Sequence, residues 1–156
     1  MTRKSIFLQP TDENELIDIV NSLNASSACG PHSIPTNLLR LGSHLLAAPI
    51  SLIINQSFTQ GIFPDVLKIA KVVPIYKSGD AKYCSNYRPI SLLSNLSKVL
   101  EKAMHSRVSA YLEKFKLIYD LQFGFRKHNS SSHALINFVN TVSDVLDRGD
   151  LHVVCF

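Results

Sequence analysis

The chain has few of the features that mark secreted, metal-stabilised or membrane-spanning proteins. Its three cysteines, Cys29, Cys84 and Cys155, are far apart and form no Cys-x-x-Cys pair. Neither a disulfide framework nor a zinc site is therefore predicted. The first residues lack the apolar run of a signal peptide, and no stretch approaches the ~20 apolar residues of a membrane span. Reduced thiols favour an intracellular protein, in the nucleus or the cytoplasm.

The composition is that of a folded domain, and its charge is unevenly distributed. Hydrophobic residues make up 46% of the 156 and charged residues 18%, which is typical of a chain with its own core. The basic excess lies in residues 68–107, whereas residues 1–67 are net acidic and residues 108–156 are neutral. A concentrated basic segment predicts a phosphate-binding surface, although a solvated Lys/Arg face explains the same pattern. Its basic residues are Lys68, Lys71, Lys77, Lys82, Arg88, Lys98, Lys102 and Arg107.

Hydrophobic periodicity predicts an α+β chain that is mostly helical and carries one irregular β-hairpin. Two runs rich in β-branched and aromatic residues flank a turn-like segment. Pro74 and Pro89 lie within them and cannot donate to a ladder, so both are expected at edges or bulges. The expected helices are 12–24, 36–41, 43–60, 95–114 and 130–146, with one further turn after Pro64. The expected strands are 71–77, 86–93 and a buried final run at 151–156.

Local signals mark the ends of these helices. Thr11 is expected to cap the first helix and Thr36 the second, and Ser130 the last. Pro49 predicts a kink or restart in the long helix, and Gly61 its end. The buried face expected for the last helix consists of Ala134, Leu135, Phe138, Val142 and Leu146.

Three segments carry a family resemblance. They are GPHSIPTNLL at residues 30–39, the long run GIFPDVLKIAKVVPIYKSGDAKYCSNYRPISLLSNLSKVLEK at residues 61–102, and LIYDLQFGFRKHNSSSHAL at residues 117–135. Together they resemble the reverse transcriptases of non-LTR (LINE-type, jockey-like) retrotransposons. With the flanking helices, the resemblance covers essentially the whole chain. His32, Ser33 and His128 depart from the family pattern.

The resemblance implies the fingers and the palm edge of a right-hand polymerase, truncated before its catalytic aspartates. Phe156 corresponds to the Phe of the family's Phe-x-Asp strand, so no catalytic or metal-binding residue is expected in this chain. Mg²⁺ is implied only for the complete enzyme, and the chain alone is expected to be inactive. The implied parts of residues 1–156 are an N-terminal helix (1–29), a template-side loop with helices (30–67), a basic β-hairpin (68–93), helices with the QFGFR motif (94–150) and the first palm strand (151–156).

The family motifs also imply contact residues for an RNA template, an RNA–DNA hybrid and a dNTP. The fingers hairpin of the family carries a Lys on its first strand and an Arg on its second, which match Lys77 and Arg88. A Lys places a point charge on a phosphate, and an Arg grips it with a planar fork. The implied nucleotide-binding residues are Lys77, Arg88 and Arg126, and the implied nucleic-acid-binding residues are Lys71, Gln122, Gly124 and Lys127. Tyr87, Phe123 and Phe125 are interpreted as packing residues.

Three hypotheses about function share these residues. The first is a fragment of an RNA-directed DNA polymerase that supplies template and dNTP-phosphate contacts. The second is a domesticated, non-catalytic nucleic-acid-binding module. The third is a helical protein-interaction domain whose basic segment is incidental. Salt-dependent RNA binding separates the third from the first two.

Overall fold

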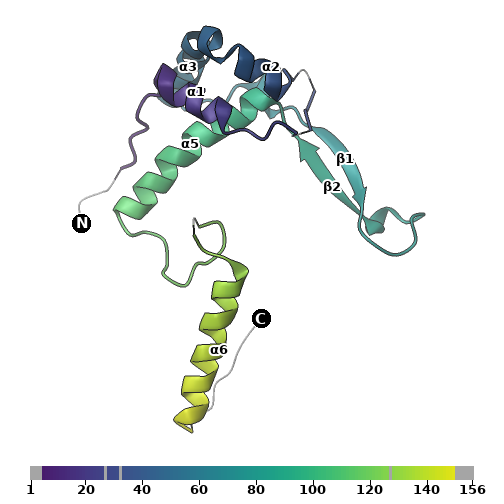
Figure 1. Ribbon diagram of the computed structural model, residues 1–156, viewed down its shortest axis with the longest axis vertical. Coiled ribbons are helices and arrows are strands. Elements are labelled where there is room, and N and C mark those ends of the chain that lie inside the picture. The colour runs from purple at the N-terminus through teal and green to yellow at the C-terminus, as the bar shows by residue number, and fades with distance from the viewer. Residues whose placement is uncertain (1–4, 27, 32, 127, 150–156) are drawn as a thin grey trace. The chain divides into compact units, whose positions relative to one another are not determined.

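The computed structural model describes residues 5–26, 28–31, 33–126 and 128–149 (Figure 1). The chain divides into two units, Met1–Tyr111 and Leu112–Phe156, and each is described by itself. His32, Lys127 and the strand expected at residues 151–156 lie outside the described residues.

The first unit combines a helical body with one β-hairpin (Figure 1). Its helices are α1 (Glu13–Asn21), α2 (Thr36–Leu41), α3 (Ser43–Gln60), α4 (Asp65–Lys68) and α5 (Asn95–Lys114), the last of which runs into the second unit. Its strands are β1 (Lys71–Tyr76) and β2 (Tyr87–Leu92), with a 3-10 turn at Cys84–Asn86 between them. The second unit holds α6 (Ser131–Asp147). The prediction of a mostly helical α+β chain is confirmed.

The cap of α1 lies one residue later than the sequence predicts. Asp12 has an extended backbone, and its side chain accepts a hydrogen bond from the Glu15 amide at 2.8 Å. The prediction that Thr11 is the cap is therefore wrong. The Thr11 backbone instead pairs with the Asn55 side chain of α3, donating to Oδ1 at 2.7 Å and accepting from Nδ2 at 3.0 Å. This pairing fastens the segment before α1 to α3.

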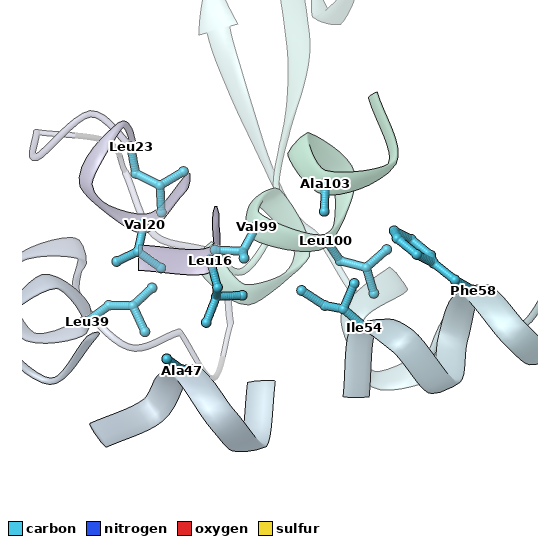
Figure 2. Close-up of a cluster of buried hydrophobic side chains, with 10 residues drawn as sticks. All are labelled: Leu16, Val20, Leu23, Leu39, Ala47, Ile54, Phe58, Val99, Leu100 and Ala103. Carbon is cyan, nitrogen blue, oxygen red and sulfur yellow. The ribbon is translucent and has the colours of Figure 1, made fainter. Parts of the chain in front are cut away.

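The helical body is held by one apolar core (Figure 2). Leu16 and Val20 of α1 are spaced four residues apart, which places both on one face of the helix. Ile54 of α3 and Leu100 of α5 point toward the same cluster, as Figure 2 shows. The helices that hydrophobic periodicity predicts at 12–24 and 95–114 therefore each bury an apolar face. The core residues are Leu16, Val20, Leu23, Leu39, Ala47, Ile54, Phe58, Val99, Leu100 and Ala103.

The helix α3 passes through Pro49 without restarting and ends at Gly61. Pro49 is exposed, so water can satisfy the carbonyl that its missing amide leaves free. Gly61 closes the helix with a left-handed backbone, φ 67°, as expected of a glycine in this position. Thr36 does not cap α2: it is the first helical residue, and Pro35 precedes it. Its side chain is buried and serves another purpose, described below.

The hairpin pairs residue for residue, from Lys71 opposite Leu92 to Tyr76 opposite Tyr87. The expected irregularity is therefore absent from this ladder. The Lys77 amide donates to the Asn86 carbonyl at 2.8 Å, which makes that pair a hydrogen-bonded one. Because hydrogen-bonded and non-hydrogen-bonded pairs alternate, Pro74 opposite Pro89 is a non-hydrogen-bonded pair. Each proline therefore lies where its nitrogen faces the open edge and costs the ladder no bond, which confirms their expected edge positions.

A proline at the centre of each open edge should protect this hairpin from pairing with other strands. We expect replacement of Pro74 and Pro89 by threonine to restore an outward amide on both edges and to raise the weight-average mass, measured by analytical ultracentrifugation. Ser91→Thr is the matched control, because residue 91 also faces the edge and already carries an amide. A double variant with the same mass as wild type at high concentration would contradict this role of the prolines.

In the second unit, Ser130 caps α6 by accepting from the His133 amide at 3.4 Å, as predicted. The expected buried face is wrong: α6 has no buried residue, and Leu135 and Leu146 are well exposed. Amphipathic spacing shows which side of a helix is apolar, whereas burial also requires an element that packs over that side. Within the described residues, no helix has the length and apolar character needed to cross a bilayer.

Candidate nucleic-acid interface

The hairpin carries its charged strand residues on one face, among Val73, Ile75, Ile90 and Leu92, and its tyrosines and prolines on the other. Side chains alternate along a strand, and residues paired across an antiparallel ladder share a face. Because Arg88 pairs with Ile75, it lies on the face that carries Lys71 and Lys77. Three cations implied by the family motifs are thus brought to one face, although they come from both strands.

The spacing on this cationic face divides the three side chains into a pair and a single residue. Lys77 and Arg88 are diagonal neighbours, about 7–8 Å apart at the backbone. Lys71 lies six residues before Lys77, or about 20 Å along the strand. All three residues are exposed. In the described part of the chain, none of their side chains has a hydrogen bond or ion pair. This face therefore presents charge to the solvent without neutralising it.

The opposite face is apolar and aromatic. The Tyr76 and Tyr87 rings meet edge to face, with centroids 5.7 Å apart and planes at 66°. The Tyr87 hydroxyl donates to the Ala81 carbonyl at 2.9 Å, and that of Tyr76 donates to the Gly79 carbonyl. Tyr87 therefore packs within the hairpin, against Tyr76, and is not part of the core of the helical body. A hollow of about 420 Å³ on this face is lined by Pro74, Cys84, Tyr87 and Pro89.

The turn between the strands is ordered by Asp80 and Gly79. The Asp80 carboxylate accepts from the Lys82 amide at 3.0 Å, and the Asp80 carbonyl accepts from Asn86 Nδ2 at 2.7 Å. Gly79 has φ 95°, a region that other residues rarely adopt. The one carboxylate of the hairpin thereby accepts a hydrogen bond within its own turn.

Several other cations of the basic segment 68–107 bind groups of the protein itself. Lys68 pairs with Asp65 at 2.7 Å, which lowers the pKa of that carboxyl below its usual 3.8 through a hydrogen bond and charge attraction. Lys102 donates to Ser22 Oγ at 2.8 Å and to the Ser22 carbonyl at 3.2 Å. Of the cations in residues 68–107, those whose side chains have no hydrogen bond or ion pair in the described part of the chain are Lys71, Lys77, Lys82 and Arg88. The unengaged charge is confined to the hairpin.

Arg107 is the most deeply engaged of these cations. Its guanidinium binds the Glu15 carboxylate through both terminal nitrogens, with the second contact at 2.6 Å. It also donates to the carbonyls of Gln9 at 2.9 Å and Pro10 at 3.1 Å, and it lies 5.6 Å from the centre of the Phe58 ring. Arg107 therefore stabilises the body and is not available to a phosphate.

The QFGFR motif belongs to the second unit, where it forms a loop before α6. Gln122 Nε2 donates to the Gly124 carbonyl at 3.0 Å, and Arg126 donates to the Tyr119 carbonyl at 3.4 Å. Phe125 has φ 60° and a fully exposed ring, so its interpretation as a packing residue is wrong, whereas Phe123 is half-buried. A Cβ at Gly124 would meet only the Gln122 side chain, at 3.6 Å, so the space beside Gly124 is open. Lys127 lies outside the described residues.

Sequence reasoning missed two residues at the base of the hairpin, Gly30 and Asn95. Asn95 is 1% exposed and donates from Nδ2 to the Ile34 carbonyl at 2.7 Å and to Thr36 Oγ1 at 3.1 Å. A signal was present, since Asn95 lies four residues before Val99 on the buried stripe of α5. An amide on an apolar stripe requires internal partners.

No group of three or more His, Cys, Asp or Glu side chains that could hold a metal ion occurs within residues 5–26, 28–31, 33–126 and 128–149. The described residues therefore do not fit a catalytic Mg²⁺, and no chemical step is assigned to such an ion here.

No protein-family model matches the chain. Curated proteins resemble it along most of its length. It is 28% identical over 148 residues to the RNA-directed DNA polymerase from mobile element jockey of Drosophila funebris, covering 94% of this chain and 16% of that protein. The Drosophila melanogaster protein of the same description is 27% identical over 97% of the chain and 17% of its own length. A probable RNA-directed DNA polymerase from transposon BS of Drosophila melanogaster is 29% identical over 81% of the chain and 14% of its own length.

The chain thus spans about one sixth of the length of the jockey relatives that it matches. Their similarity includes the segments that carry the family motifs, since it extends over 148 and 153 of the 156 residues. The resemblance inferred from the motifs is confirmed: this chain is similar, over most of its length, to the RNA-directed DNA polymerases of jockey-like non-LTR retrotransposons.

Proposed function

We propose that this chain is the fingers part, with the palm edge, of an RNA-directed DNA polymerase domain of a mobile element. Its role is to contact the template and the triphosphate of an incoming dNTP. The proposal retains the division into an N-terminal helix, a template-side loop, a basic hairpin and a helical segment with the QFGFR motif. The observation that carries it is the cationic face of the hairpin, where Lys71, Lys77 and Arg88 have no side-chain partner among the described residues.

The geometry of this face supports two different roles. The neighbouring Lys77 and Arg88 together offer a point charge and a planar fork to one cluster of negative charge, which suits a triphosphate. Lys71, about 20 Å further along the strand, suits a phosphate of a bound nucleic-acid strand. Arg126 is proposed for the nucleotide, and Gln122, Gly124 and Lys127 for the template strand. These roles hold charge in place and do not transfer protons.

Catalysis is proposed to need residues that this chain does not contribute. Phosphoryl transfer by polymerases uses metal ions held by clustered carboxylates at the primer end. None of the carboxylates in this sequence lies in a segment that resembles such a motif. The Mg²⁺ of the complete enzyme is therefore proposed to bind outside the sixth of the relatives that this chain matches.

The test is equilibrium binding of the 156-residue chain to a labelled single-stranded RNA and to an RNA–DNA hybrid at increasing salt. We expect weak binding whose log K falls by about 0.7 per neutralised phosphate on the single strand and about 0.9 on a duplex. The same preparation should incorporate no deoxynucleotide on a primed RNA template with Mg²⁺ or Mn²⁺. Binding that is absent at low salt or insensitive to salt would refute the proposed contacts, and incorporation would refute the proposed lack of catalysis.

A further inference from the structure

We propose that Gly30 and Asn95 are positioning residues that fix the direction of the hairpin on the helical body. They join the loop of residues 28–36 to residues 92–98, where β2 passes into α5; this contact is called the joint below. The consequence for RNA binding rests on the function proposed above. The joint itself rests only on the packing described here.

Gly30 brings two backbones closer together than any side chain would permit. Its amide donates to the Leu93 carbonyl at 3.2 Å. A Cβ at this position would lie 2.4 Å from the Leu92 carbonyl oxygen and 2.7 Å from the Leu93 carbonyl carbon. These atoms belong to the backbone at the end of β2 and cannot rotate away. The close approach therefore requires glycine at residue 30.

Asn95 satisfies the other side of the joint. Asn95 is 1% exposed, so its side-chain amide is shielded from solvent. Its Nδ2 donates to both the Ile34 carbonyl and Thr36 Oγ1. Its backbone N–H donates to Ser33 Oγ at 3.0 Å. Asn95 thus binds the loop at several points. The buried Thr36 hydroxyl accepts a hydrogen bond from Asn95 and does not cap a helix.

Lys98 extends the joint by one turn of α5. Its ammonium donates to the Ala28 carbonyl and to Asn95 Oδ1, each at 3.3 Å. Only Leu93 and Ser94 separate β2 from α5. An isolated two-stranded hairpin has little rigidity of its own, so its direction is set where its strands enter the body. The joint lies at one of these two entries.

A fixed hairpin should bind RNA better than a loose one without making any additional contact. Ordering a flexible hairpin at the moment of binding lowers the affinity, whereas a hairpin that is already ordered avoids this loss. A loosened joint should therefore weaken binding and leave the dependence on salt unchanged, because the same cations still neutralise the same phosphates. Removing a residue that contacts phosphate instead changes both the affinity and its dependence on salt.

The test uses Asn95→Asp, which keeps the shape of the side chain, removes its two donors and places a carboxylate beside the Lys98 ammonium, and it is compared with Thr36→Val, which changes no charge. We expect roughly 10-fold weaker binding to single-stranded RNA with the same slope of log K against log salt. Hydrogen exchange should become faster at Gly30 and at the paired amides of β2, and should stay unchanged in α1 and α3. Thr36→Val is a second variant that removes one acceptor of Asn95 and should show the same pattern more weakly. If Asn95→Asp does not fold, Thr36→Val decides the question.

Ala103→Gly is the control, because it destabilises the buried side of α5 without touching the joint. It should lower the melting temperature and leave RNA affinity and exchange in β2 unchanged. Gly30→Ala combined with Asn95→Asp should lose no more affinity than the stronger single variant, since both open the same joint. A reduced salt slope in Asn95→Asp, or faster exchange in the loop but not in β2, would overturn the positioning role. If wild type binds no RNA, the proposed function fails, and the exchange measurements alone decide the joint.

Discussion

Replacing Arg107 by alanine should destabilise the protein more than any other single removal of a cation in the first unit. We expect a loss of about 2–4 kcal/mol in the free energy of unfolding, because the change leaves the Glu15 carboxylate and two backbone carbonyls without their donor. The Arg107 side chain is 9% exposed, whereas that of Glu15 is 31% exposed. Water can therefore solvate part of the orphaned carboxylate, which keeps the loss below that of a fully buried pair.

Chemical denaturation followed by circular dichroism measures this difference. Lys102→Ala is the matched control: Lys102 lies on the same helix and also binds the body, but through an exposed ammonium. It should cost less than about 1 kcal/mol. Arg107→Lys should also lose most of the stabilisation that Arg107 provides, since an ammonium cannot bind a carboxylate through two parallel hydrogen bonds. Equal losses for Arg107→Ala and Lys102→Ala would contradict the anchoring role of Arg107.

Replacing Lys71, Lys77 and Arg88 together by alanine should nearly abolish RNA binding. If each residue neutralises one phosphate, the slope of log K against log salt should flatten by about 2 on single-stranded RNA. Extrapolated from 1 M salt, this corresponds to roughly 100-fold weaker binding at 0.1 M. Fluorescence anisotropy with one labelled RNA across a salt series measures both quantities. Stability should be nearly unchanged, because the three side chains are exposed.

A control that removes the same net charge separates site-specific contact from general attraction. Lys68, Lys102 and Lys114 are each engaged within the chain, with Asp65, Ser22 and the Phe115 ring respectively. Replacing these three by alanine should change the slope by less than half as much. If the two triple variants weaken binding equally, RNA responds only to net charge, and the assignment of the hairpin face is wrong.

The sequence predicted the elements of the first unit well because their signals are local. The spacing of Leu16, Val20 and Leu23 defines a helix without reference to any distant residue, and so does that of Val99, Leu100 and Ala103. The errors at Thr11 and Thr36 have a common cause. Each threonine is suited to capping, but in each case a distant asparagine, Asn55 or Asn95, binds it instead. These contacts form only in the folded chain, so the sequence around each threonine does not reveal them.

The candidate interface was predictable only in part, for a similar reason. Because side chains alternate along a strand, the sequence alone places the neighbours Tyr87 and Arg88 on opposite faces. Which cations of residues 68–107 remain available was not predictable, because the ion pair of Arg107 reaches back 92 positions to Glu15. The apolar face of α6 illustrates the converse limit: its spacing is amphipathic, but spacing alone does not determine that the face is buried.

The two faces of the hairpin constrain how this region can change in length. Deleting one residue early in β1 would exchange the faces of every β1 position beyond the deletion, so that Lys77 would move to the face of Tyr87 and Tyr76 to the face of Arg88. The same deletion between residues 78 and 85 would shorten a turn and leave the pairing of both strands intact. Among related copies that are still selected for binding nucleic acid, insertions and deletions should therefore gather in this turn and be absent from the strands. Copies that have drifted free of selection should accumulate them in both places, so the location of length changes would distinguish working elements from relics.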